Sequence, residues 1–500
     1  MINIKILNTE CRIIGSVDSE TAKILDKQCS YVHQSFSYMQ SKRGSYRGWD
    51  GIVRLFKNGR FPIGLLPRVE HILRKRNISY AKESFKTKIT YGKSLEIDPN
   101  CFFKPRIYQT EAVNSCIKNG MGIVKMPTGS GKTGTLSMLT GHYNIKTMIY
   151  VIGVELLYQM KSTIETLYPN LEVGIIGDGI CDIKDINIAT IWSAAAAFNK
   201  KIDAFDSDVT YDKRKNSKIN KEKVRRAVRE AEMFILDECQ YAAANTVQFL
   251  HRESVSAVHR FLFSASPWRD GGDDILIEAV GGRKIYDLDA SRLIKDGFLV
   301  QPEIHFLSVP PIRGVGANYQ DVYKRYIVEN EERNNMIIDA AKKLLSAGRK
   351  VLILVTRVGH GKELMSLANN SNLECDFLDG NKSSKERMRV IKKMKDGELN
   401  LLVASKIFDQ GVDIPELDAL ILAGSGKSSG RALQRLGRVI RKHPNKKRAI
   451  VVEFDDNAKY LKDHSDARYR VYKTESMFKI KRTGKDRSKD YKVRTPAKWI

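Results

Sequence analysis

The sequence predicts an α/β protein with two parallel-sheet lobes, a small α+β domain before them and a basic tail after them. The main observation is that short apolar runs alternate with longer mixed segments, which is typical of βαβ units. This alternation occurs in two separate series, at 122–266 and at 350–454. A chain of 500 residues is also too long for one hydrophobic core. We expect domains at 1–100, 101–295, 296–460 and 461–500.

Each lobe is expected to contain five buried strands followed by polar or glycine-containing loops. In the first lobe they are 122–126, 147–153, 186–192, 233–238 and 260–266. In the second lobe they are 350–356, 374–380, 399–405, 418–424 and 448–454. The boundary between the lobes is expected near 291–304. A charged stretch at 203–232 has no apolar run, which predicts an exposed loop leading into a basic helix.

The charge of the chain indicates a polyanionic partner. Its 85 Lys and Arg residues outnumber 58 Asp and Glu residues, which gives a formal charge of +27. Nucleic acid is the leading candidate, and a merely soluble basic surface is the alternative. No long basic amphipathic helix stands out, which argues against binding to an anionic membrane surface.

The cysteines and the hydropathy pattern indicate a cytosolic protein. The seven cysteines are scattered and never spaced as CxxC, which argues against a disulfide framework and a zinc site. The N-terminus has no apolar signal segment, and no run reaches the roughly 18 apolar residues that span a bilayer.

Both ends of the chain are rich in basic residues. In the N-terminal hundred, aromatic residues alternate with Lys and Arg, so Tyr46, Trp49 and Phe56 are candidates to stack on bases or to open a fork. For each aromatic taken singly, a place in the domain's own core is favoured. Candidates for contacts with a phosphate backbone are Arg43, Arg47, Arg54 and Lys57. Residues 468–498 carry twelve basic residues against three acidic ones, which predicts a mobile, solvated tail.

A phosphate-loop pattern, GSGK followed by Ser or Thr, occurs at 129–133 and again at 424–428. The first copy lies between an apolar run and a plausible helix, a context that points backbone N–H groups and a helix N-terminus at phosphates. Lys132 would neutralise phosphate charge and Thr133 would place its hydroxyl on Mg²⁺. The strict pattern has glycine where this chain has Met126.

An acidic pair supports the first copy as the ATP site. Asp237 and Glu238 end an apolar run, which places two carboxylates at the carboxyl edge of a parallel sheet. We expect Asp237 to bind the metal ion, and Glu238 to orient and deprotonate the attacking water.

The second copy is expected to be a linker. The segment after it predicts a helix on which Gln434, Arg438 and Arg441 share one face. Two arginines there suit stabilisation of a phosphoryl transition state. A second nucleotide site would need its own acidic pair, and the chain after Ser428 offers only 451–456 for one.

The ordered set of motifs resembles the superfamily 2 helicases over 104–456. The matching segments are 104–113 for the adenine-reading Q motif, 126–133 for motif I, 151–160 for motif Ia, 188–193 for motif Ic, 237–240 for motif II, 264–269 for motif III, 352–364 for motif IV, 404–415 for motif V and 434–441 for motif VI. The resemblance implies two RecA-like lobes and ATP hydrolysis with Mg²⁺. In the family, Gln109 would contact the base, and Tyr108 or Arg106 would lie near its ring.

The resemblance also implies roles for other matched positions. The remaining nucleotide-binding residues would be Thr128, Gly129, Ser130, Gly131, Gly411, Asp413 and Gln434. Residues that couple hydrolysis to movement would be Gln240, Ser264 and Ser266. A nucleic-acid strand would lie across Thr190, Thr356, Arg357 and Ser405. In this chain Gln240 stands where many relatives have His, and Ser266 stands where Thr is usual.

Within the superfamily, the chain most resembles phage DNA helicases of the UvsW type, relatives of the RecG and XPB motors. The segments that carry this resemblance are 47–67 and 326–337. It implies a monomeric, phage-encoded enzyme that unwinds and branch-migrates forked or four-way DNA in replication, recombination and repair, in the host cytoplasm. The alternatives are an RNA helicase, the motor subunit of a restriction system, and a DNA-binding clamp that uses ATP only as a switch.

Overall fold

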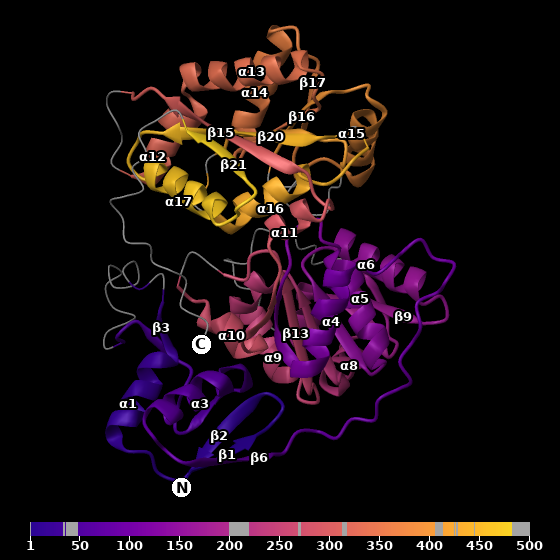
Figure 1. The fold of residues 1–500 in the computed structure, drawn as a ribbon, viewed down its shortest axis with the longest axis vertical. Coiled ribbons are helices and arrows are strands. Elements are labelled where there is room, and N and C mark those ends of the chain that lie inside the picture. Colours follow the sequence, from indigo (N-terminus) through magenta and orange to yellow (C-terminus); the bar gives the residue numbers. More distant parts are fainter. Residues whose placement is uncertain are drawn as a thin grey trace. The chain divides into compact units, whose positions relative to one another are not determined.

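The computed structural model describes residues 2–33, 36, 49–199, 220–268, 272–312, 318–405, 414–424, 426, 429–444 and 446–482. The chain forms two compact units (Figure 1). The first contains the described residues up to 126 and from 131 to 287, and the second contains 127–130 and the described residues from 288 onward. The change of unit at 287/288 lies just before the segment that the sequence predicted as the lobe boundary.

The N-terminal part of the first unit is a small α+β domain, as predicted. Its sheet has the strand order β5-β2-β1-β6, and a separate hairpin pairs β3 with β4. The strands are β1 (Ile2–Ile6), β2 (Glu10–Ile14), β3 (Ser30–Val32), β4 (Ile52–Arg54), β5 (Arg60–Pro62) and β6 (Tyr80–Ser84). The helices are α1 (Ser19–Gln28), η1 (Ile63–Leu65) and α3 (Leu66–Lys75). Both helices α1 and α3 contribute buried side chains to the core of this domain, among them Leu25 and Val69.

The rest of the first unit is built on a parallel sheet of order β10-β9-β11-β8-β12-β13-β7-β14, with β10 antiparallel at one edge. The five predicted strands are confirmed as β7 (Met121–Lys125), β8 (Thr147–Val151), β11 (Ile186–Thr190), β12 (Met233–Asp237) and β13 (His259–Ser264). The sequence analysis missed β9 (Val173–Gly177), β10 (Ile180–Asp182) and β14 (Lys284–Asp287), whose glycines and charged residues interrupt the apolar pattern.

Helices connect these strands. They are α4 (Ile107–Asn119), α5 (Lys132–Tyr143), α6 (Val154–Leu167), α7 (Ile191–Ala197), α8 (Lys221–Glu230), η4 (Cys239–Ala243), α9 (Asn245–Glu253) and α10 (Ile275–Gly281). The basic helix predicted within 203–232 is α8, and the loop predicted before it lies almost entirely outside the described residues.

The second unit contains a parallel sheet of order β17-β18-β16-β19-β20-β15-β21. The predicted strands are confirmed as β16 (Val351–Leu354), β17 (Cys375–Leu378), β18 (Leu401–Ala404), β19 (Ala419–Leu422) and β20 (Arg448–Asp456). The missed strands are β15 (Gln301–Val309) and β21 (Lys479–Arg482). β15 alternates buried and partly exposed residues, so it shows no continuous apolar run.

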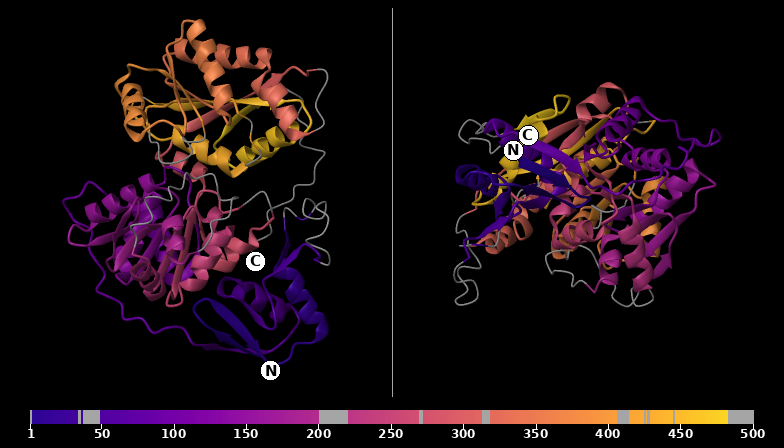
Figure 2. Two further views of the ribbon diagram at one scale, coloured as in Figure 1. Left: turned by 180° about the vertical axis from the view of Figure 1, so that it is seen from behind. Right: turned by 90° about the horizontal axis from the view of Figure 1, so that it is seen from below.

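Helices cover both faces of this second sheet (Figure 1). They are α11 (Ala290–Lys295), α12 (Tyr319–Tyr323), η5 (Lys324–Val328), α13 (Glu331–Ser346), α14 (Val358–Asn370), α15 (Ser384–Asp396), α16 (Ser429–Val439) and α17 (Leu461–Lys473). On one face Ile337 of α13 shares a core cluster with Ile353. On the other, Tyr469 and Tyr472 of α17 contact Phe306. The view from behind in Figure 2 shows the same layers.

The prediction of a mobile, solvated tail at 468–498 is wrong for its described part. This part forms the end of α17 and β21, and β21 pairs with β15. Arg468 is buried and forms an ion pair with Glu453 of β20 at 3.0 Å, while Arg482 lies 2.8 Å from Asp455. Arg468 and Arg482 thus pair with carboxylates outside 468–498, so a count of charges within that segment could not predict its order.

Buried polar contacts attach the N-terminal domain to the parallel-sheet part of its own unit. Arg68 of α3 and Glu278 of α10 form a buried ion pair, with Nε 3.0 Å from Oε1. The Asn8 carbonyl accepts a hydrogen bond from Arg260 Nε at 3.1 Å, and its side chain donates to the Val255 carbonyl at 2.7 Å. Among the described residues, no helix is long and apolar enough to cross a membrane.

Candidate active site

The first GSGK copy forms a turn between β7 and α5. Gly129 and Gly131 have φ values of +85° and +79°, which glycine adopts at little cost. A side chain at Gly131 would also come within 2.6 Å of the Gln109 amide nitrogen. α5 begins at Lys132, so its first backbone N–H groups and the positive end of the helix lie directly after the turn. This arrangement suits the binding of a phosphate group.

Met126 occupies the position where the strict phosphate-loop pattern has glycine. Its side chain is fully buried, and its N–H donates to the Ser264 carbonyl at 3.0 Å, which continues the pairing of β7 with β13. Its carbonyl lies 3.5 Å from Lys132 Nζ. The backbone of Met126 therefore makes the contacts with β13 and Lys132, and its side chain is part of the hydrophobic core.

The predicted acidic pair lies at the carboxyl end of β12. Burial, and then the neighbouring Glu238 carboxylate, raise the pKa of Asp237 to about 7, while the Lys132 ammonium acts in the opposite direction. Glu238 itself is held in the left-handed conformation at φ +61°, which a residue with a side chain adopts rarely. The structure therefore brings Asp237 and Glu238 to the same sheet edge as the phosphate loop.

These residues fit a magnesium ion. Thr133 and Asp237 offer a hydroxyl and a carboxylate, the hard oxygen ligands that Mg²⁺ takes in small number beside phosphates and water. A cation would also relieve the repulsion between the carboxylates of Asp237 and Glu238 that raises the pKa of Asp237. Among the described residues, no group of three or more His, Cys, Asp and Glu forms a metal site, so the nucleotide's phosphates would have to complete the coordination.

The three residues predicted to couple hydrolysis to movement form one hydrogen-bonded network with the acidic pair. Gln240 Nε2 donates to Glu238 Oε2 at 3.0 Å, and Gln240 Oε1 accepts from Ser264 Oγ at 2.7 Å. Ser264 Oγ in turn accepts from the Ser266 N–H at 3.0 Å. The structure brings together all of these predicted residues, which come from the ends of two adjacent strands, β12 and β13.

The residues predicted to contact adenine lie at the start of α4. Gln109 is almost fully buried, accepts from the Arg106 N–H at 2.9 Å and donates to the Gly131 carbonyl at 3.2 Å. Arg106 Nη1 lies 2.7 Å from the hydroxyl of the buried Tyr108. The structure thus shows Gln109 bracing the phosphate loop, and its contact with the base stays a prediction.

One prediction about the arginines of the second unit is wrong. Gln434 and Arg438 lie on α16, but this helix ends at Val439, and Arg441 pairs instead with Leu299 in an isolated β-bridge. The buried Lys446 explains the early end, because its Nζ donates to the Val439 and Arg441 carbonyls at 3.1 and 2.9 Å. The predicted residues Gly411 and Asp413 lie outside the described residues.

Carbonyls of the second GSGK copy, and of the residue before it, face hydrogen-bond donors from other elements of the second unit. The Ala423 carbonyl accepts from Arg333 Nη1 at 2.8 Å and the Gly426 carbonyl accepts from Arg468 Nη1 at 3.1 Å. The Gly424 carbonyl is 3.3 Å from Thr356 Oγ1. A phosphate cradle needs N–H groups that face an anion, and these groups have the opposite polarity. This geometry supports the prediction of a linker, although Ser425, Lys427 and Ser428 lie outside the described residues.

The acidic residues near this second copy are also engaged. Glu453 is paired with Arg468, and Asp456 is paired with Arg333 at 2.7 Å, all four side chains being buried. The sequence analysis missed Arg333 and Arg468 as determinants of this loop. No local signal could have found them, because Arg333 and Asp456 are 123 positions apart.

The predicted strand-contacting residues of the second unit lie at one sheet edge. Thr356 and Ser405 follow the carboxyl ends of β16 and β18, which pair directly. Arg357 stacks on Tyr323, with its guanidinium 4.8 Å from the ring centre. In the first unit, Thr190 caps α7, where its Oγ1 accepts from the Ser193 N–H at 3.2 Å.

The N-terminal candidates are partly engaged within their own domain. Trp49 Nε1 donates to the Ile52 carbonyl at 3.3 Å, and Phe56 stacks on Phe61 at 5.8 Å. Arg54 lies 3.1 Å from a carboxylate oxygen of Asp26 and also pairs with Asp50. Phe56 thus packs against the core of this domain, whereas Trp49 is partly buried. Arg43, Tyr46 and Arg47 lie outside the described residues.

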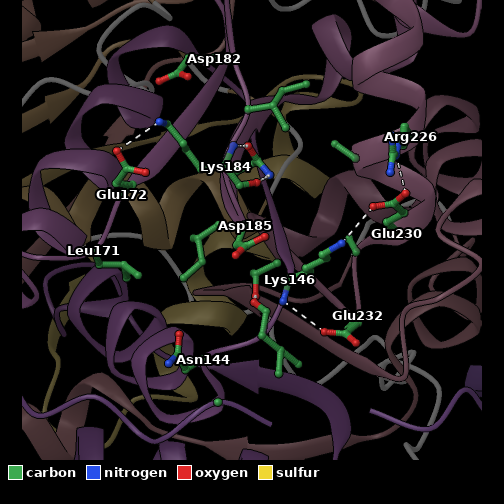
Figure 3. A pocket seen from close by; sticks show the side chains of 18 of the residues that line it. Asn144, Lys146, Leu171, Glu172, Asp182, Lys184, Asp185, Arg226, Glu230 and Glu232 are labelled. Atoms are coloured by element: carbon green, nitrogen blue, oxygen red, sulfur yellow. Dashed lines mark hydrogen bonds and ion pairs between the residues drawn. The ribbon is translucent and has the colours of Figure 1, made fainter. Parts of the chain in front are cut away.

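A cavity of about 1170 Å³ lies at the opposite, amino-terminal edge of the first sheet (Figure 3). Its walls carry neighbouring charges of both signs, with Lys146 3.0 Å and Arg226 2.6 Å from Glu230. None of the predicted site residues lines it. The candidate active site and this cavity are therefore separate features of the first unit.

Two family models match the chain at the two parallel-sheet lobes. The model described as type III restriction enzyme, res subunit, matches residues 102–269, and the helicase conserved C-terminal domain matches residues 336–443. Together they cover more than half of the 500 residues.

Individual relatives agree with these matches. Putative helicase 22 of Sulfolobus islandicus filamentous virus is 26% identical over 70% of this chain and 64% of its own length. The ATP-dependent DNA helicase uvsW of Enterobacteria phage T4 is 25% identical over 88% of each chain. The solved structure of the type ISP restriction-modification enzyme LlaBIII bound to DNA has the same fold, with a TM-score of 0.55 at 14% identity over 76% of this chain and 32% of that one. The chain thus spans less than two thirds of the first of these relatives.

Two lobes of RecA-like fold, a phosphate loop and an acidic pair joined to motif III place the chain in a known class. It belongs to the superfamily 2 helicases. Within that class, it is related to the UvsW helicase of phage T4.

Proposed function

We propose that this chain uses ATP hydrolysis to move along and unwind DNA, and that forked or four-way DNA is its substrate. The observation that carries the proposal is the hydrogen-bonded path from Glu238 through Gln240 to Ser264. This path connects Glu238, the carboxylate expected to activate water, to Ser264 of motif III. A site that only bound ATP would not need such a connection.

The hydrolysis step follows from the residues at the phosphate loop. Lys132 and the N-terminus of α5 bind the phosphates, and Glu238 orients and deprotonates the attacking water. Mg²⁺, when bound by Thr133 and Asp237, neutralises phosphate charge. Arg438 and Arg441 stabilise the charge that develops during phosphoryl transfer, and loss of such a group lowers the rate by a factor of about 10³–10⁵.

DNA as the partner is supported by charge and by kinship. A formal charge of +27 suits a phosphate backbone, and the phage T4 relative is named a DNA helicase. Thr356, Arg357 and Ser405, grouped at one edge of the second sheet, are suited to hold a strand through its phosphates. Such contacts carry no sequence information, so binding is independent of sequence and weakens steeply with salt.

The test is the ATPase rate with no nucleic acid, RNA, single-stranded DNA, duplex, a fork and a four-way junction, with Lys132→Ala as the blank. Strong stimulation by branched DNA that Lys132→Ala lacks supports the proposal, and strand separation is then measured on the same forks. Equal or greater stimulation by RNA would favour the RNA helicase. Tight DNA binding without stimulated hydrolysis would favour the ATP-switched clamp.

A further inference from the structure

Helix α15 of the second unit carries an unusual excess of positive charge. Its thirteen residues include six Lys and Arg and two acidic residues. The two acidic residues lie near its ends, and Glu386 is used to cap the helix, where it accepts from the Ser383 N–H at 2.8 Å. The charge of the helix is therefore not neutralised from within.

Three of these cations form a row on the solvent-exposed face. Lys385, Arg389 and Lys392 are spaced i, i+4 and i+7, so they lie on one side of the helix, and all three are exposed. Among the described residues, no carboxylate lies within ion-pair distance of any of them. Met388, on the same side, is 66% exposed. This face thus combines cations that have no carboxylate partner among the described residues with an exposed apolar side chain.

Helix α8 is a basic surface helix of the same protein on which the arginines do have carboxylate partners. It is similarly rich in Lys and Arg, but Arg226 lies 2.6 Å from Glu230 and Arg229 lies 2.8 Å from Glu253. Both arginines there have carboxylate partners. The contrast suggests that the unpaired cations of α15 serve a partner outside the chain.

The position of α15 connects it to the proposed strand-binding edge. The helix starts a few residues after the carboxyl end of β17, and Ser405 at the end of β18 donates its N–H to Leu378, the last residue of β17, at 2.9 Å. The start of α15 therefore follows the same sheet edge that holds Thr356 and Ser405. From there the row 385–392 extends over about 10 Å, which matches about three phosphates of one DNA strand.

We propose that the exposed face of α15 is a second DNA-binding surface, on which Lys385, Arg389 and Lys392 contact the sugar-phosphate backbone of duplex DNA. This inference rests on the proposed function and adds to it a contact surface outside the helicase motifs. The surface is independent of sequence, because point charges on phosphates do not read bases. None of its residues belongs to the phosphate loop or to the acidic pair, so we expect this surface to affect DNA affinity and to leave the hydrolysis step itself intact.

The experiment compares three proteins for binding to a labelled duplex over a series of salt concentrations. They are the full-length wild type, the variant Lys385→Gln/Arg389→Gln/Lys392→Gln in α15, and the variant Lys223→Gln/Arg226→Gln/Arg229→Gln in α8. Each variant loses three positive charges. Removal of three phosphate contacts should lower the slope of log affinity against log salt by about 2.7 for the α15 variant. The α8 variant should keep most of the wild-type slope.

Melting temperature and ATPase rate without DNA should be unchanged in both variants, since these side chains are exposed. An unchanged slope in the α15 variant overturns the inference and leaves the proposed function intact. An equal loss of slope in the two variants also overturns it, because net charge alone would then explain the effect. A loss of slope with RNA but not with duplex DNA overturns the choice of partner. A wild type that binds no nucleic acid overturns both the inference and the proposed function.

Discussion

The hydroxyl of Ser264 donates to the side-chain oxygen of Gln240 at 2.7 Å, while the amide nitrogen of the same glutamine donates to Glu238. A glutamine can make both bonds at once because its amide has a donor and an acceptor end. Gln240 is thus a bridge from the carboxylate of motif II to motif III. A change of nucleotide state at Glu238 would reach Ser264 through this side chain, and also through the 3.3 Å contact between the Ser264 hydroxyl and Glu238 Oε2.

Gln240→Ala should separate hydrolysis from movement. We expect DNA-stimulated ATPase to stay within a few-fold of wild type and strand separation per ATP to fall about tenfold, the size of a coupling free energy of about 1.4 kcal/mol. Both rates are measured on one forked substrate, with the exposed Gln28→Ala as control. Equal losses of ATPase and unwinding would show that Gln240 acts in hydrolysis itself.

The variant Glu238→Gln should bind ATP as the wild type does but hydrolyse it much more slowly. The amide keeps the size of the side chain and its place beside Gln240, but it cannot take a proton from water. The expected loss is about 10²–10⁴ in kcat, the range for removal of a general base. Nucleotide binding by titration with a fluorescent ATP analogue should be close to wild type. A variant that still hydrolyses ATP at full rate would remove Glu238 from the mechanism.

Arg438→Ala and Arg441→Ala should each lower kcat by about 10³–10⁵ if both arginines reach the γ-phosphate. The structure makes this a test of two different positions, because Arg438 is on α16 and Arg441 follows it in a β-bridge. Arg431→Ala, an exposed change on the same helix, is the control. If only one arginine matters, the other has been wrongly assigned.

Arg68→Ala should destabilise the protein by about 3–5 kcal/mol, because it leaves the Glu278 carboxylate buried without its partner. Arg68→Met/Glu278→Leu should recover most of that loss, since it removes both charges. Urea unfolding followed by tryptophan fluorescence measures both. A single variant as stable as wild type would mean that water reaches Glu278.

Buried histidines should contribute less stability as the pH drops below about 6.5, where a histidine of the unfolded chain takes up a proton. Burial lowers the pKa of His360 to about 3, so this side chain stays neutral in the fold, with Nε2 2.9 Å from Asn334 Oδ1. Burial also lowers the pKa values of His251 and His259. At these histidine positions the unfolded state therefore binds more protons, for His360 between about pH 3 and 6.5, and their contribution to stability increases with pH through this window.

For His360 alone, the loss between pH 7 and pH 5 is about 2 kcal/mol. Urea unfolding of wild type and His360→Gln at the two pH values measures it, and the variant should show the smaller difference. An identical pH dependence in the two proteins would contradict the assignment to His360.

The sequence by itself determined the motor core. Apolar runs between turn residues predict β7, β8, β12 and the central strands of the second sheet, because buried parallel strands need continuous apolar segments. The glycines of 129–131 and the pair Asp237–Glu238 could be placed in advance for a similar reason. The conformation of a phosphate loop and the location of a strand-end carboxylate both depend on residues a few positions apart.

Only the tertiary structure decided which charged residues are paired within the fold and which remain free to bind a partner. Arg468 and Arg482 look like parts of a solvated tail in the sequence, but they pair with carboxylates of the second unit. Arg333, which is distant in the sequence, donates a hydrogen bond to the Ala423 carbonyl beside the second GSGK loop. Arg441 lies beyond the end of the helix that its spacing predicted and forms a β-bridge. Local patterns fix strands and turns, whereas the partner of a charge depends on which distant segments the fold brings within a few ångströms.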